Sequence, residues 1–253
     1  MPRFFVRSNQ IQDGFVSIMG DDAHHISRSL RMAVGEHITV CDMQRTEYEC
    51  ELAEFLPNAV HARILRSYQC DTEPPFFAHV FQALPKGDKL DSIIQKSVEC
   101  GLNELTTFES ERCIVRMKDG AEGKKLERRE RIALEAAKQC GRGTLPAIHP
   151  TVGFVEAVAK AAEADIALFC YEGDETEPLA KVLKRCLTQI PDKCERIPTV
   201  SIMIGSEGGF SLSEAQYARE NKLIPVGLGK RILRTETAAS FVLACLVYEF
   251  ELH

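Results

Sequence analysis

The chain has 253 residues, a formal net charge of −6 at pH 7, 45% hydrophobic residues and 27% charged residues, a composition that is ordinary for a soluble globular protein. No apolar run approaches the roughly 20 residues that a membrane span needs, so we expect no transmembrane helix. Residues 1–15 lack the sections of a secretory signal, and the ten cysteines show no CxxC or Cys/His spacing, so we expect reduced thiols, a cytoplasmic location and no metal site.

Short strands around one helix are predicted for the first seventy residues. The strands are expected at 4–8, 37–42, 47–55 and 59–68, and the helix at 21–32 with Asp21 or Asp22 as its N-cap. These elements suit a small β-barrel-like module. The polar stretch Gln69–Pro75 interrupts the pattern. We therefore expect two domains, residues 1–72 and residues 73–253.

Strands alternate with helices beyond this boundary. The strands are predicted at 76–84, 104–110, 165–172, 200–205 and 224–229. The helices are predicted at 88–101, 124–141, 152–164, 177–190, 211–222 and 237–252. Alternation of this kind implies an α/β domain with a mostly parallel sheet.

A glycine-rich turn, GSEGG, follows the strand predicted at 200–205. Ser211 and Glu214 form a capping-box pattern, so the next helix is expected to begin near Leu212. The turn then lies at the C-terminal end of a strand, where open α/β sheets bind ligands. It matches neither GxGxxG nor GxxxxGK[ST], and Glu207 would repel phosphate. S-adenosylmethionine, which is cationic at sulfur, fits better; the alternative is a turn that needs glycine for positive φ, with Glu207 merely exposed.

A second glycine turn, with Gly227 and Gly229, precedes a basic and apolar run. Thr235 or Thr237 is the predicted cap of the helix that follows. With the strand end at 165–172, these turns predict one cleft lined by three loops. Arg234 is flanked by apolar residues, so it either points at a specific group or pairs with Glu236.

The segment from Arg112 to Arg142 is basic within an acidic chain. It holds ten basic and five acidic residues, a net charge of +5. The segment is either a solvated helix with i,i+4 ion pairs or an electrostatic footprint for RNA.

Motifs along nearly the whole chain resemble one family, the RsmE 16S ribosomal RNA uridine-N3 methyltransferases of the SPOUT superfamily. The segments that carry the resemblance are MPRFFV, HHISRSLRMAVGE, ALPKGDKLDSIIQKSVECGLNEL, RRERIALEAAKQCGRGTLPAI, LFCYEG, IGSEGGFS and LGKRILRTETA. The family usually has proline where Ser206 stands and serine where Cys113 stands. The resemblance implies an α/β fold, with a small PUA-like β-barrel for RNA followed by a SPOUT domain whose parallel sheet carries a trefoil knot.

The resemblance also implies function. It predicts a homodimeric enzyme that uses S-adenosylmethionine, without metal or membrane, on 16S ribosomal RNA of the small subunit. The alternatives are a SPOUT methyltransferase acting on tRNA or another ribosomal site, and a non-catalytic RNA-binding assembly factor. A dehydrogenase is disfavoured because no GxGxxG unit is present.

Individual roles follow from the same resemblance. Arg234 would stabilise the uridinate, and Glu207 would be either the base at N3 or a clamp on its loop. The expected cofactor contacts are Phe169, Tyr171, Glu172, Gly205, Ser206, Gly208, Leu228, Gly229, Ile232, Leu233 and Thr235. The expected RNA contacts are Arg3, Arg7, Arg28, Arg31, Arg112 and Arg142.

Overall fold

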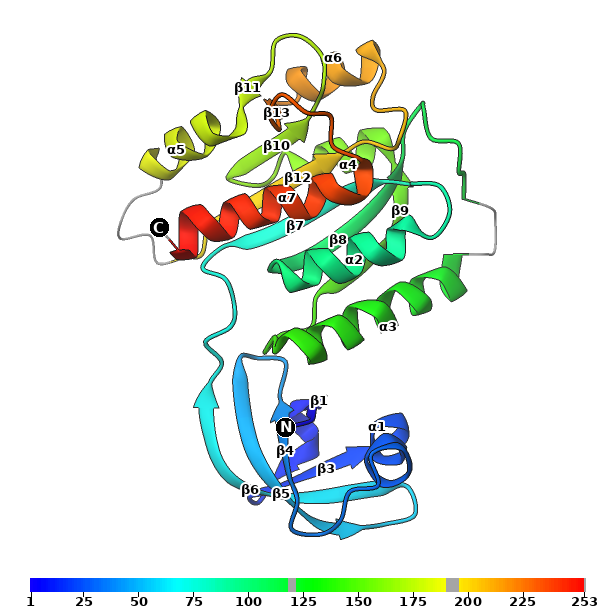
Figure 1. Cartoon of the computed structure of the whole chain (residues 1–253), viewed down its shortest axis with the longest axis vertical. Helices are drawn as coiled ribbons and strands as arrows, with labels where there is room; N and C mark the ends of the chain where they lie inside the picture. Colours follow the sequence, from blue (N-terminus) through cyan, green and yellow to red (C-terminus); the bar gives the residue numbers. More distant parts are fainter. Residues whose placement is uncertain (118–121, 190–195, 253) are drawn as a thin grey trace. The chain divides into compact units, whose positions relative to one another are not determined.

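The structure of the protein is a computed structural model that describes residues 1–117, 122–189 and 196–252 (Figure 1). The chain forms two compact units, the first made of Met1–Glu73 with Ala137–Leu145 and the second of Pro74–Ala136 with Pro146–His253. Residues 137–145 therefore group with the first unit, although a single cut at residue 72 would assign them to the second. Within the described ranges, no helix has the length and apolarity needed to cross a bilayer.

Some predicted features fall on residues that the structure does not describe. They are Lys118 and Asp119 of the basic segment, Ile190 of a predicted helix, and Cys194.

The first unit is built on a curled six-stranded sheet in the order β1-β4-β5-β6-β3-β2 (Figure 1). Its strands are β1 (Arg3–Phe5), β2 (Ile11–Gln12), β3 (Phe15–Met19), β4 (His37–Cys41), β5 (Thr46–Phe55) and β6 (Ala59–Gln69). The pair β1–β4 is parallel and the other pairs are antiparallel. Alternate side chains of these strands point inward, and Phe4, Ile18, Ile38 and Leu52 form the centre of the core.

Two features of the first unit differ from the prediction. The hairpin β2–β3 was not predicted; it turns at Asp13-Gly14, both with positive φ, the two-residue turn that this dipeptide favours. The predicted helix 21–32 is instead α1 (Gly20–His24) continued by a π-helix at His25–Ser29. The predicted caps are also wrong, because Met19 is the N-cap and makes no side-chain bond, and Asp21 and Asp22 lie inside the first turn.

The second unit is a parallel seven-stranded sheet in the order β11-β13-β10-β12-β7-β8-β9. The strands are β7 (Phe77–Ala83), β8 (Leu102–Glu109), β9 (Ala147–Gly153), β10 (Ile166–Cys170), β11 (Glu177–Pro178), β12 (Thr199–Ile204) and β13 (Ile224–Gly227). The helices are α2 (Lys89–Glu99), α3 (Glu122–Cys140), α4 (Phe154–Ala161), α5 (Leu179–Gln189), α6 (Leu212–Glu220) and α7 (Thr235–Val247). The predicted α/β class is confirmed.

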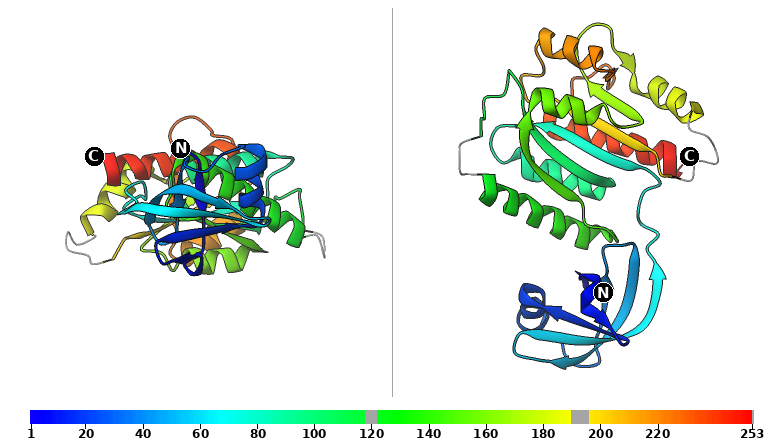
Figure 2. Two further views of the ribbon diagram at one scale, coloured as in Figure 1. Left: turned by 90° about the horizontal axis from the view of Figure 1, so that it is seen from below. Right: turned by 180° about the vertical axis from the view of Figure 1, so that it is seen from behind.

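Helices cover both faces of this sheet. Helices α2 and α7 pack together on one face, and α4 covers the other (Figures 1 and 2). On the α4 face Phe81, Phe108 and Phe169 are fully buried beside Ala157 of the helix. This core packs against the middle strands, and the loops follow the C-terminal ends of those strands.

Strand β9 and the start of α4 differ from the prediction. Residues 152–164 were expected to be helical, but Val152 and Gly153 end a strand and α4 begins at Phe154. The strand runs through Pro150 and, among the described strands, pairs with β8 alone at the sheet edge, a position where a missing backbone donor is tolerated. Its proline and polar residues hid it from the sequence pattern.

Candidate active site

The three glycine-rich or aromatic loops meet at one edge of the sheet. Strand β10 lies between β12 and β13, and all three are parallel, with Phe169 opposite Met203 and Cys170 opposite Val226. The C-terminal ends of neighbouring parallel strands lie at the same edge. The loops at 171–176, 205–211 and 228–234 are therefore neighbours, as the sequence predicted.

The GSEGG loop is a tight turn that leads into a capped helix. The Gly209 N–H donates to the Ser206 carbonyl oxygen at 2.9 Å, and Gly209 has φ +64°, which favours glycine. Ser211 then forms the predicted capping box: the Glu214 N–H donates to Ser211 Oγ, and the Ser211 N–H donates to the Glu214 carboxylate. The helix begins at Leu212, as expected.

Packing inside the protein explains two of the glycines in this loop. A Cβ on Gly205 would lie 3.1 Å from the Phe210 ring, and a Cβ on Gly208 would lie 3.0 Å from Arg112 Cβ. Arg112 Nη1 also donates to the Gly208 carbonyl oxygen at 3.1 Å. Gly229 differs, since its φ is +113° and open space lies where its side chain would be. Of these glycines, Gly229 therefore leaves the most room for a ligand.

Glu207 joins the glycine turn to the loop after β7. Its Oε1 accepts a hydrogen bond from Lys89 Nζ at 2.8 Å and another from the Lys86 backbone N–H at 3.1 Å. Burial acts to raise the pKa of Glu207, but these bonds outweigh it and hold that pKa below its ordinary value. Lys89 Nζ is also 3.4 Å from Glu236 at the start of α7. Sequence reasoning missed Lys89, which lies 118 residues from its partner.

Thr235 holds three elements together from inside the fold. Its Oγ1 donates to the Gly205 carbonyl oxygen at 2.7 Å and accepts from Gln82 Nε2, at the end of β7, at 2.9 Å. Thr235 is buried and is the first residue of α7. The prediction that Thr235 or Thr237 caps this helix is wrong, because the N-cap is Arg234 and it makes no side-chain cap. The hydroxyl of Thr235 instead hydrogen-bonds to Gln82 near the end of β7 and to Gly205 directly after β12.

Arg234 extends its side chain away from the fold. Its backbone carbonyl accepts from the N–H groups of Thr237 and Ala238, which fixes the residue at the helix start. Its side chain is 81% exposed, and Nη1 lies 4.0 Å from Glu236, a loose contact. The backbone is therefore fixed while the cation is presented to solvent.

The remaining predicted cofactor residues differ in what they expose. The Phe169 side chain is fully buried, so only its backbone can face a ligand. The Tyr171 N–H donates to the Val226 carbonyl oxygen at 3.1 Å, which leaves its carbonyl and half-buried ring. Leu228 and Leu233 are half-buried, whereas Glu172 and Ile232 are exposed.

Ser206 carries a polar atom without a visible role in the fold. The residue is 7% exposed, and its Oγ has no hydrogen-bond partner among the described residues. A buried hydroxyl without a partner costs free energy. Because Ser206 lies in the GSEGG loop, its hydroxyl is available for a hydrogen bond to a bound molecule.

Two of the six predicted RNA-contact arginines are engaged inside the first unit. Arg3 Nη1 donates to Glu47 at 2.7 Å. Arg142 forms a two-pronged pair with Glu73, with side chains 3% and 1% exposed. Both guanidinium groups already have carboxylate partners, with which an RNA phosphate would have to compete, and their contact with RNA stays a prediction. Arg7, Arg28, Arg31 and Arg112 are exposed.

The basic helix α3 uses part of its charge within the fold. Arg128 pairs with Asp91 of α2, and buried Arg129 lies 3.4 Å from Glu122. Lys138 donates to Asp22 of the first unit at 2.8 Å. Most of these partners come from other elements, so the simple picture of i,i+4 pairs on a solvated helix does not describe them. Lys124, Lys125 and Arg131 are exposed.

Comparison with known proteins adds to this geometry. Residues 72–247 match the family model of an RNA methyltransferase domain, and residues 18–65 match an RNA methyltransferase PUA domain. A ribosomal RNA small subunit methyltransferase E of Bacillus subtilis is 31% identical, over 100% of this chain and 98% of its own length. The crystal structure of a ribosomal RNA small subunit methyltransferase E from Neisseria gonorrhoeae, bound to S-adenosyl methionine, superimposes with a TM-score of 0.83 at 30% identity, covering 99% of this chain and 98% of that one.

Proposed function

This chain belongs to the RNA methyltransferase family whose model it matches, and from that premise we propose that it methylates N3 of one uridine in 16S ribosomal RNA. It is an S-adenosylmethionine-dependent RNA methyltransferase with an N-terminal PUA domain. The observation that carries the substrate is the end-to-end similarity to proteins named ribosomal RNA small subunit methyltransferase E.

The residues of the three neighbouring loops, 171–176, 205–211 and 228–234, fit the cofactor. The buried Ser206 hydroxyl lacks a partner among the described residues, Gly229 faces open space, and Leu228 and Leu233 are half-buried apolar side chains. We propose that Ser206 hydrogen-bonds the bound cofactor and that the two leucines pack against its adenine ring. The other contacts would be backbone groups of Phe169, Tyr171, Gly205, Gly208 and Gly229, with Glu172 and Ile232 at the rim. Thr235 acts indirectly, since its hydroxyl already holds the strand ends together.

Arg234 is the proposed catalytic residue. The cofactor supplies an electrophilic methyl group on a sulfonium; the bond from N3 to that carbon forms as the bond to sulfur breaks. N3 must lose its proton to solvent water, which places negative charge on the two neighbouring carbonyl oxygens. An exposed guanidinium on a fixed backbone can donate to these oxygens and stabilise that charge where it develops. Holding the base in line with the methyl group supplies further rate.

We propose that Glu207 is a loop clamp and not the base. Its carboxylate is bonded to Lys89 and to the Lys86 N–H, and its pKa is lowered. A carboxylate held in this way is a weaker proton acceptor than a free one. It joins the glycine turn to the loop after β7, so its loss would loosen the cofactor site.

The RNA would contact both units. We propose that residues 1–72 act as the RNA-binding domain and residues 73–253 as the methyltransferase domain. The support is the PUA match together with exposed Arg7, Arg28 and Arg31 in the first and exposed Arg112 in the second. The target base would be extruded from its stack, since chemistry at N3 must reach a base edge.

We propose a cytoplasmic homodimer with a trefoil knot in its second unit. An apolar stripe on the closing helical segment, with Phe241, Ala244, Tyr248 and Leu252 exposed, supports an interface with a second copy because its members recur at helical spacing. Free thiols at the nine described cysteines support a reducing compartment.

Nucleoside analysis tests this function. In cells lacking the protein, 3-methyluridine should vanish from 16S ribosomal RNA and should return with the wild-type chain but not with Arg234→Ala. Unchanged 3-methyluridine in 16S RNA would refute the proposed substrate, and loss of a methylated nucleoside from tRNA would identify the alternative target. Full restoration of 3-methyluridine by Arg234→Ala would refute the catalytic role of Arg234.

A further inference from the structure

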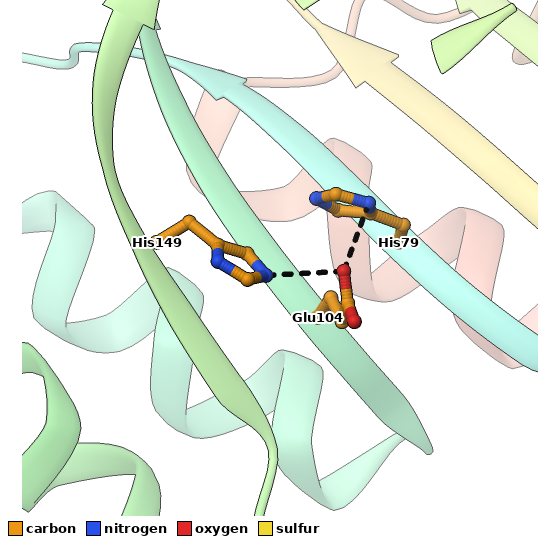
Figure 3. A group of neighbouring side chains, drawn as sticks. All are labelled: His79, Glu104 and His149. Carbon is orange, nitrogen blue, oxygen red and sulfur yellow. Dashed lines mark hydrogen bonds and ion pairs between the residues drawn. The ribbon is translucent and has the colours of Figure 1, made fainter. Parts of the chain in front are cut away.

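Three potential metal ligands meet on the α4 face of the second unit (Figure 3). His79 comes from β7, Glu104 from β8 and His149 from β9, and both imidazole rings point toward one carboxylate oxygen. His79 Nδ1 lies 3.3 Å and His149 Nε2 lies 3.0 Å from Glu104 Oε2. The strand registers produce this arrangement, because His79 pairs with Glu104 and the partner of Thr106 on β9 is His149.

The spacing of these atoms is that of ligands around one ion. Zinc binds histidine nitrogen and carboxylate oxygen at about 2.0–2.2 Å, so two ligands at a tetrahedral angle lie about 3.3 Å apart. The three ligand atoms all lie within 4.8 Å of one another, and they form the one group of three such side chains found in the described part of the chain. Small side-chain rotations would bring all three onto a common ion.

A second contact orients one of the histidines. His79 Nε2 lies 2.8 Å from Thr106 Oγ1, and its ring stacks on Phe81 with centroids 4.0 Å apart. When Nε2 donates to the hydroxyl, the lone pair of Nδ1 points at the carboxylate. Outer contacts of this kind are what fix the tautomer and ring orientation of metal-bound histidines.

Solvent can reach the group. The side chains of His79, Glu104 and His149 are 19%, 29% and 39% exposed. The nearby cation on α4, Lys160, has its charge offset by Glu156 at 2.8 Å. The donors are therefore accessible to solvent.

We propose that His79, Glu104 and His149 form a site for a divalent metal ion of the zinc class. Two imidazole nitrogens and one carboxylate oxygen suit Zn²⁺, and the fourth position is left to water. The ion would tie β7, β8 and β9 together across the sheet. The site lies in the N-terminal half of these strands, whereas the cofactor loops follow strand C-termini, so it is independent of methyl transfer. The competing explanation is that hydrogen bonds alone hold the three side chains together, without a metal ion.

Zn²⁺ titration of the full-length, metal-stripped chain tests the site. We expect one equivalent of Zn²⁺ to bind to these three ligands and to raise the thermal unfolding midpoint. Glu104→Gln and His149→Ala should each weaken Zn²⁺ binding at least tenfold, an effect of about the size known for altered metal environments. Glu104→Gln keeps the shape of the side chain, and unfolding without metal verifies that each variant folds. The matched control is His37→Ala, which removes an imidazole 3.4 Å from Glu49 outside the proposed site and should leave binding unchanged.

Co²⁺ spectra separate this site from thiols, because thiolate ligands give intense charge-transfer bands that nitrogen and oxygen ligands lack. We expect weak ligand-field bands that disappear in His149→Ala. Absence of Zn²⁺ binding by the wild-type chain, or binding that survives unchanged in Glu104→Gln and His149→Ala, would overturn the proposal. A Co²⁺ spectrum dominated by thiolate in all variants would do the same.

Discussion

Glu73 and Arg142 form a bidentate ion pair, with Arg142 Nε 2.9 Å from one carboxylate oxygen of Glu73 and Arg142 Nη2 2.8 Å from the other. The same carboxylate accepts from the backbone N–H groups of Gly143 and Thr144 and from the Thr144 hydroxyl. The two side chains are 1% and 3% exposed. Glu73 thereby binds the segment 137–145 into the first unit, and each of its oxygens has a donor.

Removing one partner of this pair should destabilise the protein strongly. Arg142→Ala leaves a buried carboxylate without its counter-charge, and we expect the free energy of unfolding to fall by about 3–5 kcal/mol. Urea denaturation at pH 7 measures the change. Arg128→Ala is the matched control, because its pair with Asp91 is largely exposed and such pairs contribute about 1 kcal/mol or less. Equal losses in the two variants would contradict the structural role of Arg142.

The same pair predicts a dependence of stability on pH. Burial acts to raise the pKa of Glu73, but hydrogen bonds from Arg142 and Thr144 outweigh it and hold that pKa below its ordinary value. The folded chain therefore binds this proton less readily than the unfolded chain. Its stabilisation is complete above about pH 5 and is lost as the pH falls through the folded pKa. Urea midpoints from pH 7 to pH 3 should fall more steeply for wild type than for Glu73→Gln, and parallel curves would contradict this.

Glu207 and Lys89 offer a test of clamp against base. If Glu207 clamps its loop, Glu207→Gln and Lys89→Ala should both weaken S-adenosylmethionine binding, by no more than about tenfold for a partly exposed contact, and leave kcat nearly unchanged. Calorimetry and steady-state methylation give the two quantities. A large loss of kcat in Glu207→Gln alone, with an altered pH profile, would identify the residue as the base.

Thr235 should be essential for holding the C-terminal ends of β7 and β12 in place. Thr235→Val leaves the Gln82 amide and the Gly205 carbonyl without the hydroxyl that now joins them. We expect a loss of about 1–3 kcal/mol in the free energy of unfolding, together with weaker cofactor binding. Thr235→Ser retains the hydroxyl and should stay close to wild type in both assays. If serine and valine behave alike, the hydroxyl bonds are not what matters.

Arg234→Ala should slow methyl transfer without harming the fold. The side chain is 81% exposed, so its loss changes little packing, whereas removal of one donor to a developing negative charge costs about 10²- to 10³-fold in rate. Single-turnover methylation of RNA measures the effect, and circular dichroism monitors the fold. Arg231→Ala removes a neighbouring exposed arginine and is the control. Comparable slowing in both variants would show that Arg234 contributes only its positive charge and makes no specific contact with the uridine.

Local patterns predicted most of the elements of this chain. The helices beginning at Lys89 and Leu212 were expected from apolar periodicity and capping, and the four main strands β7, β8, β10 and β12 from short apolar runs. The elements that were not predicted share a cause. Strand β9 and the hairpin β2–β3 owe their structure to pairing with a neighbour, which outweighs local preference.

The sequence by itself determined the α/β class, the turn that precedes Leu212 and the three strand ends at which we propose the cofactor site, because periodicity and turn chemistry act over a few residues. Tertiary structure alone decided the partner of each charged side chain. Glu207 meets Lys89, Arg142 meets Glu73, and His79 meets Glu104 and His149. These partners lie tens of residues apart or more, and their contacts depend on strand order and register. Local sequence does not encode that information.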